Sequence, residues 1–263
     1  MIDRKQMALI RKDIRGIVAN KQHFLVLIIV PLVLALVLPT IFILVVHFAP
    51  EETGDLEMML RLLPAGEKFT DLSRLFIGLI LNYIMPIFFI IIPVMGASVM
   101  AASSFVGEKE KRTLETLLYC PLTIRQIFRA KILASFAVSM LVTAISFVAM
   151  LAVVEIELVL TIGGMILPSV SWLIVLLLIA PAISLIAITI IVRGSAKAQT
   201  MEESQQKSTF LVLPVVLLVV GQFTGLVLIS AWMFLGIGLV LALIAALCIR
   251  GSMRKADYEA LLK

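Results

Sequence analysis

The residue types that most often do chemistry are scarce in this sequence of 263 residues. Its two histidines, His23 and His47, stand at opposite ends of one apolar stretch, and no His-Glu-x-x-His occurs, so a zinc site on one helical turn is excluded. A serine–histidine dyad with His47 is possible, but no orienting partner is evident. Cys120 and Cys248 lack metal-ligand spacing, and a disulfide is not expected. The Gly-x-x-x-x-Gly-Lys-Ser/Thr loop that holds ATP phosphates is also absent. We therefore expect no catalysis, metal or cofactor in this chain.

One charged run, over residues 107–131, is the most informative polar segment. Leu114, Leu117 and Leu118 recur at helical spacing and predict one apolar face on a short helix. Pro121 predicts the end of that helix, because the residue before a proline is disfavoured in the helical region. Thr123 starts a capping-box pattern with the glutamine three residues later, so a new helix is expected to begin there. From the charge pattern alone, the carboxylates of this run would be a solvated surface.

Composition identifies the elements that must position this run. Apolar residues make up 62% of the chain and charged residues 15%, against about 45–50% and 25% in soluble domains. The apolar stretches are continuous, whereas barrel strands alternate, so we expect an all-α integral membrane protein. About 20 residues cross a hydrocarbon core of about 30 Å. Six windows have that length: 24–46, 75–102, 132–154, 170–192, 210–229 and 232–249. A re-entrant hairpin within 210–249 is the alternative to the last two crossings.

The distribution of basic residues predicts the orientation. Of the 22 Lys and Arg, 19 lie in the N-terminal segment, the second and fourth connections and the C-terminal tail. The positive-inside rule therefore places both termini in the cytoplasm. Membrane topology explains the net charge of +5, so binding to nucleic acid is an unnecessary inference.

The N-terminal segment, residues 1–23, is predicted to be an amphipathic interfacial helix. Its apolar positions recur at helical spacing opposite basic residues. These apolar positions are Met7, Ile10, Ile14, Ile17 and Val18. We expect the apolar side to face membrane lipids and the basic side to face headgroups. Contact with a cytoplasmic partner is the alternative.

The charged run resembles the signature of type-2 ABC exporter permeases. The residues that carry the resemblance are Glu108, Glu110, Thr113, Leu114, Glu115, Leu117, Leu118, Pro121, Leu122, Thr123, Ala130 and Lys131. Arg112 departs from the pattern, since many members have Gly there. In that family the signature lies between the second and third of six spans and forms the coupling helix that docks on the ATP-hydrolysing subunit.

The resemblance implies one transmembrane permease domain over residues 1–263, with a coupling region at 107–123. It also implies a separate dimer of ATPase subunits that binds ATP and Mg, and a second permease, identical or related. The resemblance assigns the contact with the ATPase to Glu108, Glu110, Thr113, Leu114, Glu115, Leu117, Leu118, Pro121 and Thr123.

Polar residues also occur within the predicted spans. Four of them lie on one face of the third span: Ser135, Ser139, Thr143 and Ser146. Such a stripe can line a substrate path or a contact between permeases, but more often it packs helices together. Asn82 and Gln222 are the most polar side chains in the spans, and interhelical hydrogen bonds are their expected role. Three prolines, Pro86, Pro93 and Pro181, are expected to kink the second and fourth spans.

We expect an ATP-driven exporter subunit in a prokaryotic plasma membrane, with hydrophobic or amphipathic cargo such as peptides, lipids or drugs. Sodium efflux is one alternative, because residues 195–206 weakly resemble a loop of sodium-efflux members. A passive channel or secondary carrier is another. The six windows hold no Asp, Glu, Lys or Arg, which argues against a proton-coupled carrier with an acidic site at the membrane midplane.

Overall fold

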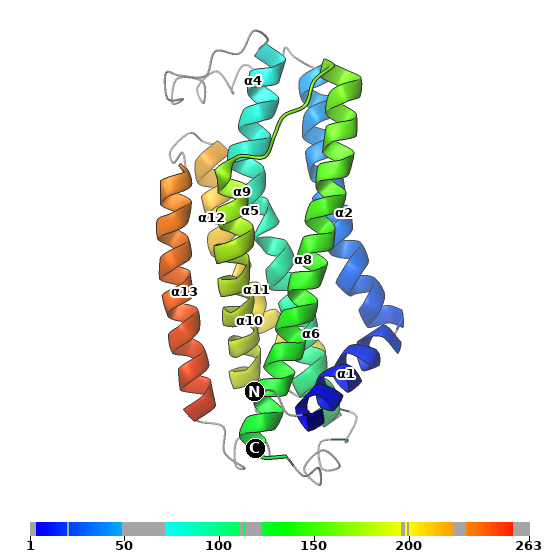
Figure 1. Cartoon of the computed structure of the whole chain (residues 1–263), viewed down its shortest axis with the longest axis vertical. Helices are drawn as coiled ribbons and strands as arrows, with labels where there is room; N and C mark the ends of the chain where they lie inside the picture. Colours follow the sequence, from blue (N-terminus) through cyan, green and yellow to red (C-terminus); the bar gives the residue numbers. More distant parts are fainter. Residues whose placement is uncertain are drawn as a thin grey trace.

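The computed structural model is an elongated bundle of helices, shown in Figure 1. It describes residues 4–19, 21–48, 72–110, 113, 122–195, 198, 200–223 and 230–254. All regular secondary structure among these residues is helical. Five helical stretches are long and apolar enough to cross a membrane: Phe24–Phe48, Arg74–Glu110, Ile124–Ile162, Val170–Gly194 and Ala231–Ser252. They coincide with five of the six predicted windows, and this confirms the all-helical, multi-pass membrane fold.

The N-terminal part consists of α1, Arg4–Ala19, and α2, Lys21–Phe48. In Figure 1, α1 lies obliquely across one end of the bundle, and α2 rises along its side. Both helices pack on α8, Ile124–Ile162. Since α2 begins two residues after the end of α1, a displacement of α1 must also affect α2.

The second membrane stretch is interrupted where its prolines predict kinks. It consists of α4, Leu72–Leu79, the π-helical segment η2, Ile80–Ile84, then α5, Met85–Phe89, and α6, Ile91–Glu110. Pro86 follows η2, and a turn at Ile90, whose amide donates to the Ile87 carbonyl at 3.1 Å, precedes Pro93. Each proline lacks the N–H that an α-helix would use, so the helix changes its hydrogen-bond pattern just before it.

The third stretch, α8, begins as the capping box predicts. The Gln126 amide donates to Thr123 Oγ1 at 3.3 Å, and the Thr123 amide donates to Gln126 Oε1 at 2.9 Å. The helix has 39 residues, so it is about 58 Å long and extends beyond the predicted window 132–154 at both ends. It ends at Gly163, whose φ of 68° lies in the left-handed region that a glycine adopts without strain.

The remaining elements form the other half of the bundle. They are α9, Val170–Ile174, the π-helical segment η3, Val175–Ile179, then α10, Ala180–Gly194, α11, Met201–Thr209, α12, Val212–Phe223, and α13, Ala231–Arg254. As at η2, a proline, Pro181, stands just after η3, in the span where the sequence predicts a kink. With 12 residues, α12 is about 18 Å long, too short to cross a core of about 30 Å. Residues 224–229 lie outside the described part, so the sixth crossing stays a prediction.

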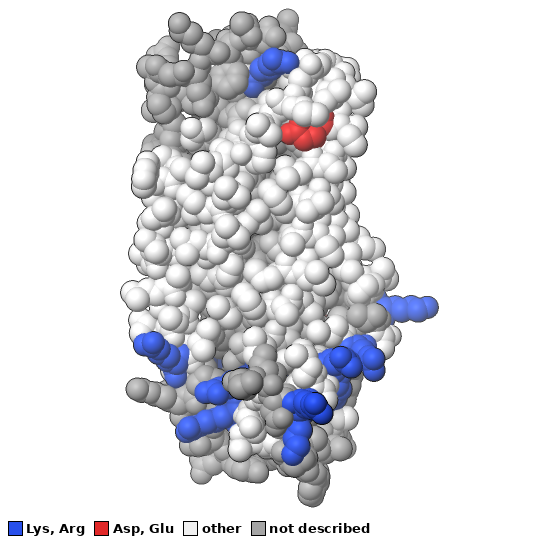
Figure 2. All heavy atoms as spheres, viewed as in Figure 1, with Lys and Arg blue, Asp and Glu red and all other residues white. Residues whose placement is uncertain are grey.

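The helices α6 and α10 form the centre of the bundle, and much of the surface of α2, α8 and α13 is exposed and apolar. Figure 2 shows an uncharged middle band, with most of the visible Lys and Arg at one end. This end, here called the basic end, carries α1, the C-terminal end of α6 and the N-terminal end of α8. An apolar band between charged ends is what a bilayer requires of a spanning protein.

Candidate functional site

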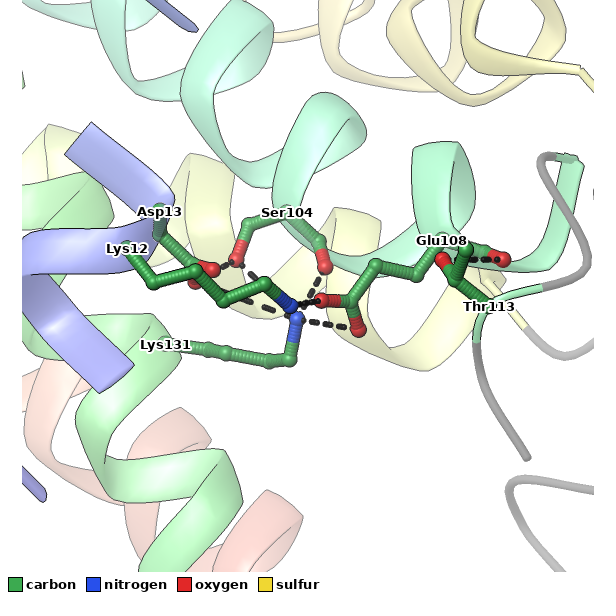
Figure 3. A network of polar contacts seen from close by, with 6 residues as sticks. All are labelled: Lys12, Asp13, Ser104, Glu108, Thr113 and Lys131. Atoms are coloured by element: carbon green, nitrogen blue, oxygen red, sulfur yellow. Dashed lines mark hydrogen bonds and ion pairs between the residues drawn. The ribbon is translucent and has the colours of Figure 1, made fainter. Parts of the chain in front are cut away.

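A network of polar side chains joins three helices at the basic end (Figure 3). It consists of Lys12 and Asp13 from α1, Ser104 and Glu108 from α6, and Lys131 from α8. We call these five residues the Lys131 network. It lies where α6 runs into the connection over residues 111–123, so it is adjacent to the segment that the sequence singles out.

The face of α1 that meets the bundle differs from the predicted one. Gln6, Leu9 and Ile17 are buried and lie on the same helical face as Asp13. Leu9 packs against Ile127 and Ala130 of α8. Ile17, which the sequence placed on the lipid-facing side, is 4% exposed and packs within the chain, whereas Met7 is 46% exposed, as a lipid-facing side chain would be. The prediction that the whole apolar side faces lipid is therefore wrong, since part of it packs within the chain and carries Asp13 into the network.

The ammonium group of Lys131 is the centre of the network. Its side chain is only 3% exposed, and Nζ lies 2.8 Å from Glu108 Oε2 and 3.8 Å from Asp13 Oδ2. Nζ also donates to the Ser104 carbonyl, and it lies 5.4 Å from the centre of the Phe105 ring. A buried ammonium is stable only when paired and hydrogen-bonded, and these contacts meet that condition.

Glu108 faces the interior of the chain. Its Oε1 lies 2.5 Å from Nζ of Lys12, and its backbone carbonyl accepts hydrogen bonds from the Thr113 amide at 2.9 Å and from Thr113 Oγ1 at 3.3 Å. The residue is 8% exposed, so its carboxylate is not part of the solvated surface that the charge pattern alone suggests. Any contribution of Glu108 to a docking surface must therefore act through the position of the backbone and of Thr113.

Asp13 is held in the network against the cost of its burial. Ser104 Oγ donates to Asp13 Oδ2 at 2.6 Å. Burial raises the pKa of the Asp13 carboxyl above its usual value of 3.8, and the negative charge of Glu108 adds to this rise. Lys131, the hydrogen bond from Ser104 and Lys12 lower the pKa, but less than burial raises it.

A small cavity of about 140 Å³ lies beside the network, between α1 and α6. Polar and apolar residues line it, including Gly16, Ser103 and Gly107 together with the network carboxylates. The cavity leaves space next to Glu108 and Asp13 that a larger side chain could enter.

The connection between α10 and α12 also reaches this end of α6. The Met201 amide, at the start of α11, donates to Glu110 Oε2 at 3.3 Å. Met201 packs so closely on Gly107 that an added Cβ there would lie 3.0 Å from Met201 Sδ. At the start of α11 the Glu203 amide donates to Thr200 Oγ1 at 3.2 Å. The second and fourth connections therefore meet at the end of α6.

Of the predicted coupling residues, the structure describes four: Glu108, Glu110, Thr113 and Thr123. Glu108 and Thr113 are joined directly, Glu110 contacts α11, and Thr123 caps α8. Leu114, Glu115, Leu117, Leu118 and Pro121 lie outside the described residues. Their contact with an ATPase stays a prediction.

The polar stripe of the third span lies within the helix packing. Ser135, Ser139, Thr143 and Ser146 are all at most 2% exposed. Ser139 Oγ donates to the Pro93 carbonyl at 2.9 Å and lies 3.3 Å from Ser184 Oγ, so it joins α8 to both α6 and α10. Helix α6 approaches closely there because Gly96 has no side chain: an added Cβ would lie 3.4 Å from the Cα of Ser139. This geometry favours packing over a path, as the sequence indicates.

The two amide side chains of the spans have different surroundings. Asn82 Oδ1 accepts a hydrogen bond from the Ser169 amide at 2.8 Å, an interhelical bond of the expected kind. Gln222, on α12, is fully buried, and neither atom of its amide has a hydrogen-bond partner. The interhelical bond expected for Gln222 is therefore not found among the residues that the structure describes.

Sequence reasoning gave no role to Lys12 and Asp13 beyond the interfacial helix, and it used Lys131 only as the end of a motif. Two signals were present. Asp13 has helical spacing to Leu9 and Ile17, so it had to share a face with them. Lys131 directly precedes a predicted span, which is a costly position for an unpaired charge.

Comparison with known families gives a match over most of the chain. Residues 7–231 match a family model described as ABC-2 family transporter protein. A search of curated proteins and a search of solved structures found no significant match. The matched range includes most of α1, the Lys131 network, the second connection and the polar stripe.

Proposed function

The chain belongs to the ABC-2 family of transporter proteins, and from this membership we propose that it is the permease of an ATP-driven exporter whose residues 107–123 dock on a separate ATPase subunit. Membership already makes it a multi-pass membrane permease without its own ATP site, which partners with an ABC ATPase. The direction of transport, the docking segment and the cargo are the proposal.

The observation that carries the proposal is the anchoring of both ends of the second connection. At one end, the Glu108 carbonyl holds Thr113, and Glu108 itself is fixed by Lys131. At the other end, the capping box at Thr123 fixes the first turn of α8. Motion of this segment would therefore act on two fixed helix ends.

We place this connection in the cytoplasm, because the Lys and Arg residues gather at the same end of the bundle (Figure 2). ATP binding closes the ATPase dimer and displaces the connection, and α6 and α8 carry the displacement into the membrane. A second copy of this chain, or a related permease, completes the path. Anionic lipids contact the exposed basic residues of α1.

The cargo is proposed to be hydrophobic or amphipathic. The predicted spans hold no Asp, Glu, Lys or Arg, and the polar stripe of α8 is used in packing. A path between such surfaces favours peptides, lipids or drugs of apolar character over ions, which require charged or closely spaced polar ligands.

The test is co-purification of the chain with a candidate ABC ATPase that carries an affinity tag. Glu115→Lys and Leu117→Glu change the connection and leave the five residues of the Lys131 network as they are. The matched control is Glu202→Lys, which adds the same positive charge at an exposed position of α11. We expect at least a tenfold loss of co-purified ATPase in the first two variants, and no loss in the control.

ATP hydrolysis by the co-purified complex is measured in the same preparations, with and without apolar peptide or lipid in vesicles. Unchanged co-purification of Glu115→Lys and Leu117→Glu would refute docking through this connection. Stimulation of hydrolysis by a sodium gradient, with none by apolar cargo, would favour sodium efflux.

A further inference from the structure

We propose that Lys131 is a positioning residue that joins α1 to the second connection, so that the two move as one unit and carry motion into the first span. The part that concerns ATP-driven motion rests on the proposed function. The part that concerns the junction itself rests on the geometry of the Lys131 network alone.

Lys131 separates two carboxylates that would otherwise repel each other. Asp13 comes from α1 and Glu108 from α6, and their side chains are 5% and 11% exposed. The Lys131 ammonium lies between them, 3.8 Å from the first and 2.8 Å from the second. The two like charges act strongly on each other at such burial, and a shared cation makes their proximity stable.

The other cation of the network cannot replace Lys131. The Lys12 side chain is 57% exposed, so water screens its pairing with Glu108. Lys131 is 3% exposed and is the only member of the network that α8 supplies. Without its ammonium, Asp13 must take up a proton or α1 must move away from α6.

The junction extends the effect of the second connection to a third membrane helix. Helices α6 and α8 are attached to the connection by the chain itself. Helix α1 is attached through Asp13 and Lys12, and α2 starts two residues after α1 ends. A displacement of the connection therefore reaches α2 through the Lys131 network.

Three variants separate a bridging charge from a side chain that only fills space. Lys131→Met keeps the length and removes the charge. Lys131→Arg keeps the positive charge and the ability to donate hydrogen bonds. Lys131→Met combined with Asp13→Asn removes the ammonium and the repulsion together. If the charge is what matters, the second and third variants behave like the unchanged chain.

The first readout is the distance between spin labels on α1 and α8, measured by pulsed electron paramagnetic resonance in lipid vesicles. The labels replace the exposed residues Arg11 and Arg129, in a background with Cys120→Ser and Cys248→Ser. We expect one narrow distance distribution in the unchanged chain, a broad one in Lys131→Met, and narrow ones in Lys131→Arg and in the double variant. A distribution in Lys131→Met that stays narrow as the pH is raised, so that Asp13 cannot remain protonated, overturns the junction. If Lys131→Met aggregates, a broad distribution in the double variant or in Lys131→Arg overturns it.

The second readout uses the complex with the ATPase. In the unchanged complex the α1–α8 distance should not change when a non-hydrolysable ATP analogue is added. Lys131→Met should still co-purify with the ATPase but lose at least fivefold of the permease-dependent ATP hydrolysis, and Lys131→Arg should restore it. A shift of the distance with nucleotide in the unchanged complex, or full hydrolysis in Lys131→Met, overturns the coupled motion. Failure of the unchanged chain to bind any ATPase refutes the proposed function, while the spin-label distances in the chain alone still decide the role of Lys131.

Discussion

Trp172 on α9 donates a hydrogen bond to a backbone carbonyl that the π-helical segment η2 leaves without its usual partner. Substitution of Trp172 tests that geometry. In η2 the Met85 amide bonds to the carbonyl of Ile80, which lies five residues back, so the carbonyl of Leu81 loses its usual partner. Trp172 Nε1 donates to that carbonyl at 3.0 Å. The ring is 3% exposed and packs edge-on against Phe89, with centroids 5.3 Å apart.

The change Trp172→Phe keeps an aromatic ring but removes the donor. It leaves the Leu81 carbonyl unsatisfied, at a cost of about 1–2 kcal/mol. The smaller ring adds about 1 kcal/mol of lost packing, so we expect a total loss of about 2–3 kcal/mol of unfolding free energy. The same change at Trp232, which is 82% exposed, should have no measurable effect.

A second substitution isolates the hydrogen bond from the packing. Pro86→Ala restores an N–H that can bond to the Asn82 carbonyl, and so allows an α-helical pattern in which Met85 bonds to Leu81. In that background Trp172→Phe should cost about 1 kcal/mol less than in the unchanged chain, because the carbonyl no longer depends on Trp172. The packing loss is the same in both backgrounds and cancels.

The assay is unfolding by SDS in mixed micelles, followed by circular dichroism, since fluorescence would change with the loss of a tryptophan. All four members of the cycle are measured with the Trp232→Phe control. If the losses of unfolding free energy caused by Trp172→Phe and Pro86→Ala add to within about 0.5 kcal/mol in the double variant, the two residues are not coupled. That result would refute the claim that Pro86 causes the π-helical pattern and that Trp172 supplies the missing donor.

Three further predictions concern other parts of the structure, and the first two use the same unfolding titration. Thr123→Ala should lower the unfolding free energy by about 1 kcal/mol, because the capping box of α8 loses its side-chain acceptor. The pKa of Asp13 is higher in the folded state than its usual 3.8. The protonated carboxyl therefore makes its whole contribution to the unfolding free energy below pH 3.8, and this contribution is lost as the pH rises through the raised pKa. Asp13→Asn lacks this titration, so its stability relative to the unchanged chain should increase from pH 4 to pH 7; a difference independent of pH would contradict the assignment. Gly96→Leu should prevent folding to a monodisperse protein, as judged by gel filtration in detergent, because α6 lies so close to Ser139, whereas Gly236→Leu on the exposed face of α13 should be tolerated.

Properties local in the sequence were predictable. The length and hydropathy of the apolar windows located five spanning stretches, because a bilayer demands about 20 apolar residues regardless of their tertiary contacts. The start of α8 followed from the spacing of Thr123 and Gln126, since a capping box is formed within one turn. Pro86 and Pro181, where kinks were expected, each follow a π-helical segment, because a missing N–H acts on its own turn, although α2 continues through Pro31 and Pro39.

Partners distant in the sequence were not predictable. Nothing near Pro86 indicates that Trp172 and Ser169 supply the donors for the carbonyls that η2 releases. The pairing of Lys131 with Asp13 likewise needs α1 to fold back on α8, and periodicity gives the faces of a helix but not its neighbours. For the same reason the sequence placed the apolar side of α1 against lipid, while Leu9 in fact packs against α8.

The positions of the network and of the helix breaks, taken together, define how far a push would travel. Helix α6 is continuous over its 20 residues, about 30 Å, from Glu110 back to Ile91, and the first break beyond it is the turn at Ile90. Helix α8 has no break in 39 residues, and Ser139 bonds it to α6 between the network and that turn. Under the proposed function, a displacement that enters at Glu108 therefore moves α6 and α8 as a stiff pair and first meets a change of hydrogen-bond pattern at Ile90 and η2. The segmented part beyond Ile90, rather than the polar stripe of α8, is then where the bundle must bend to open a path.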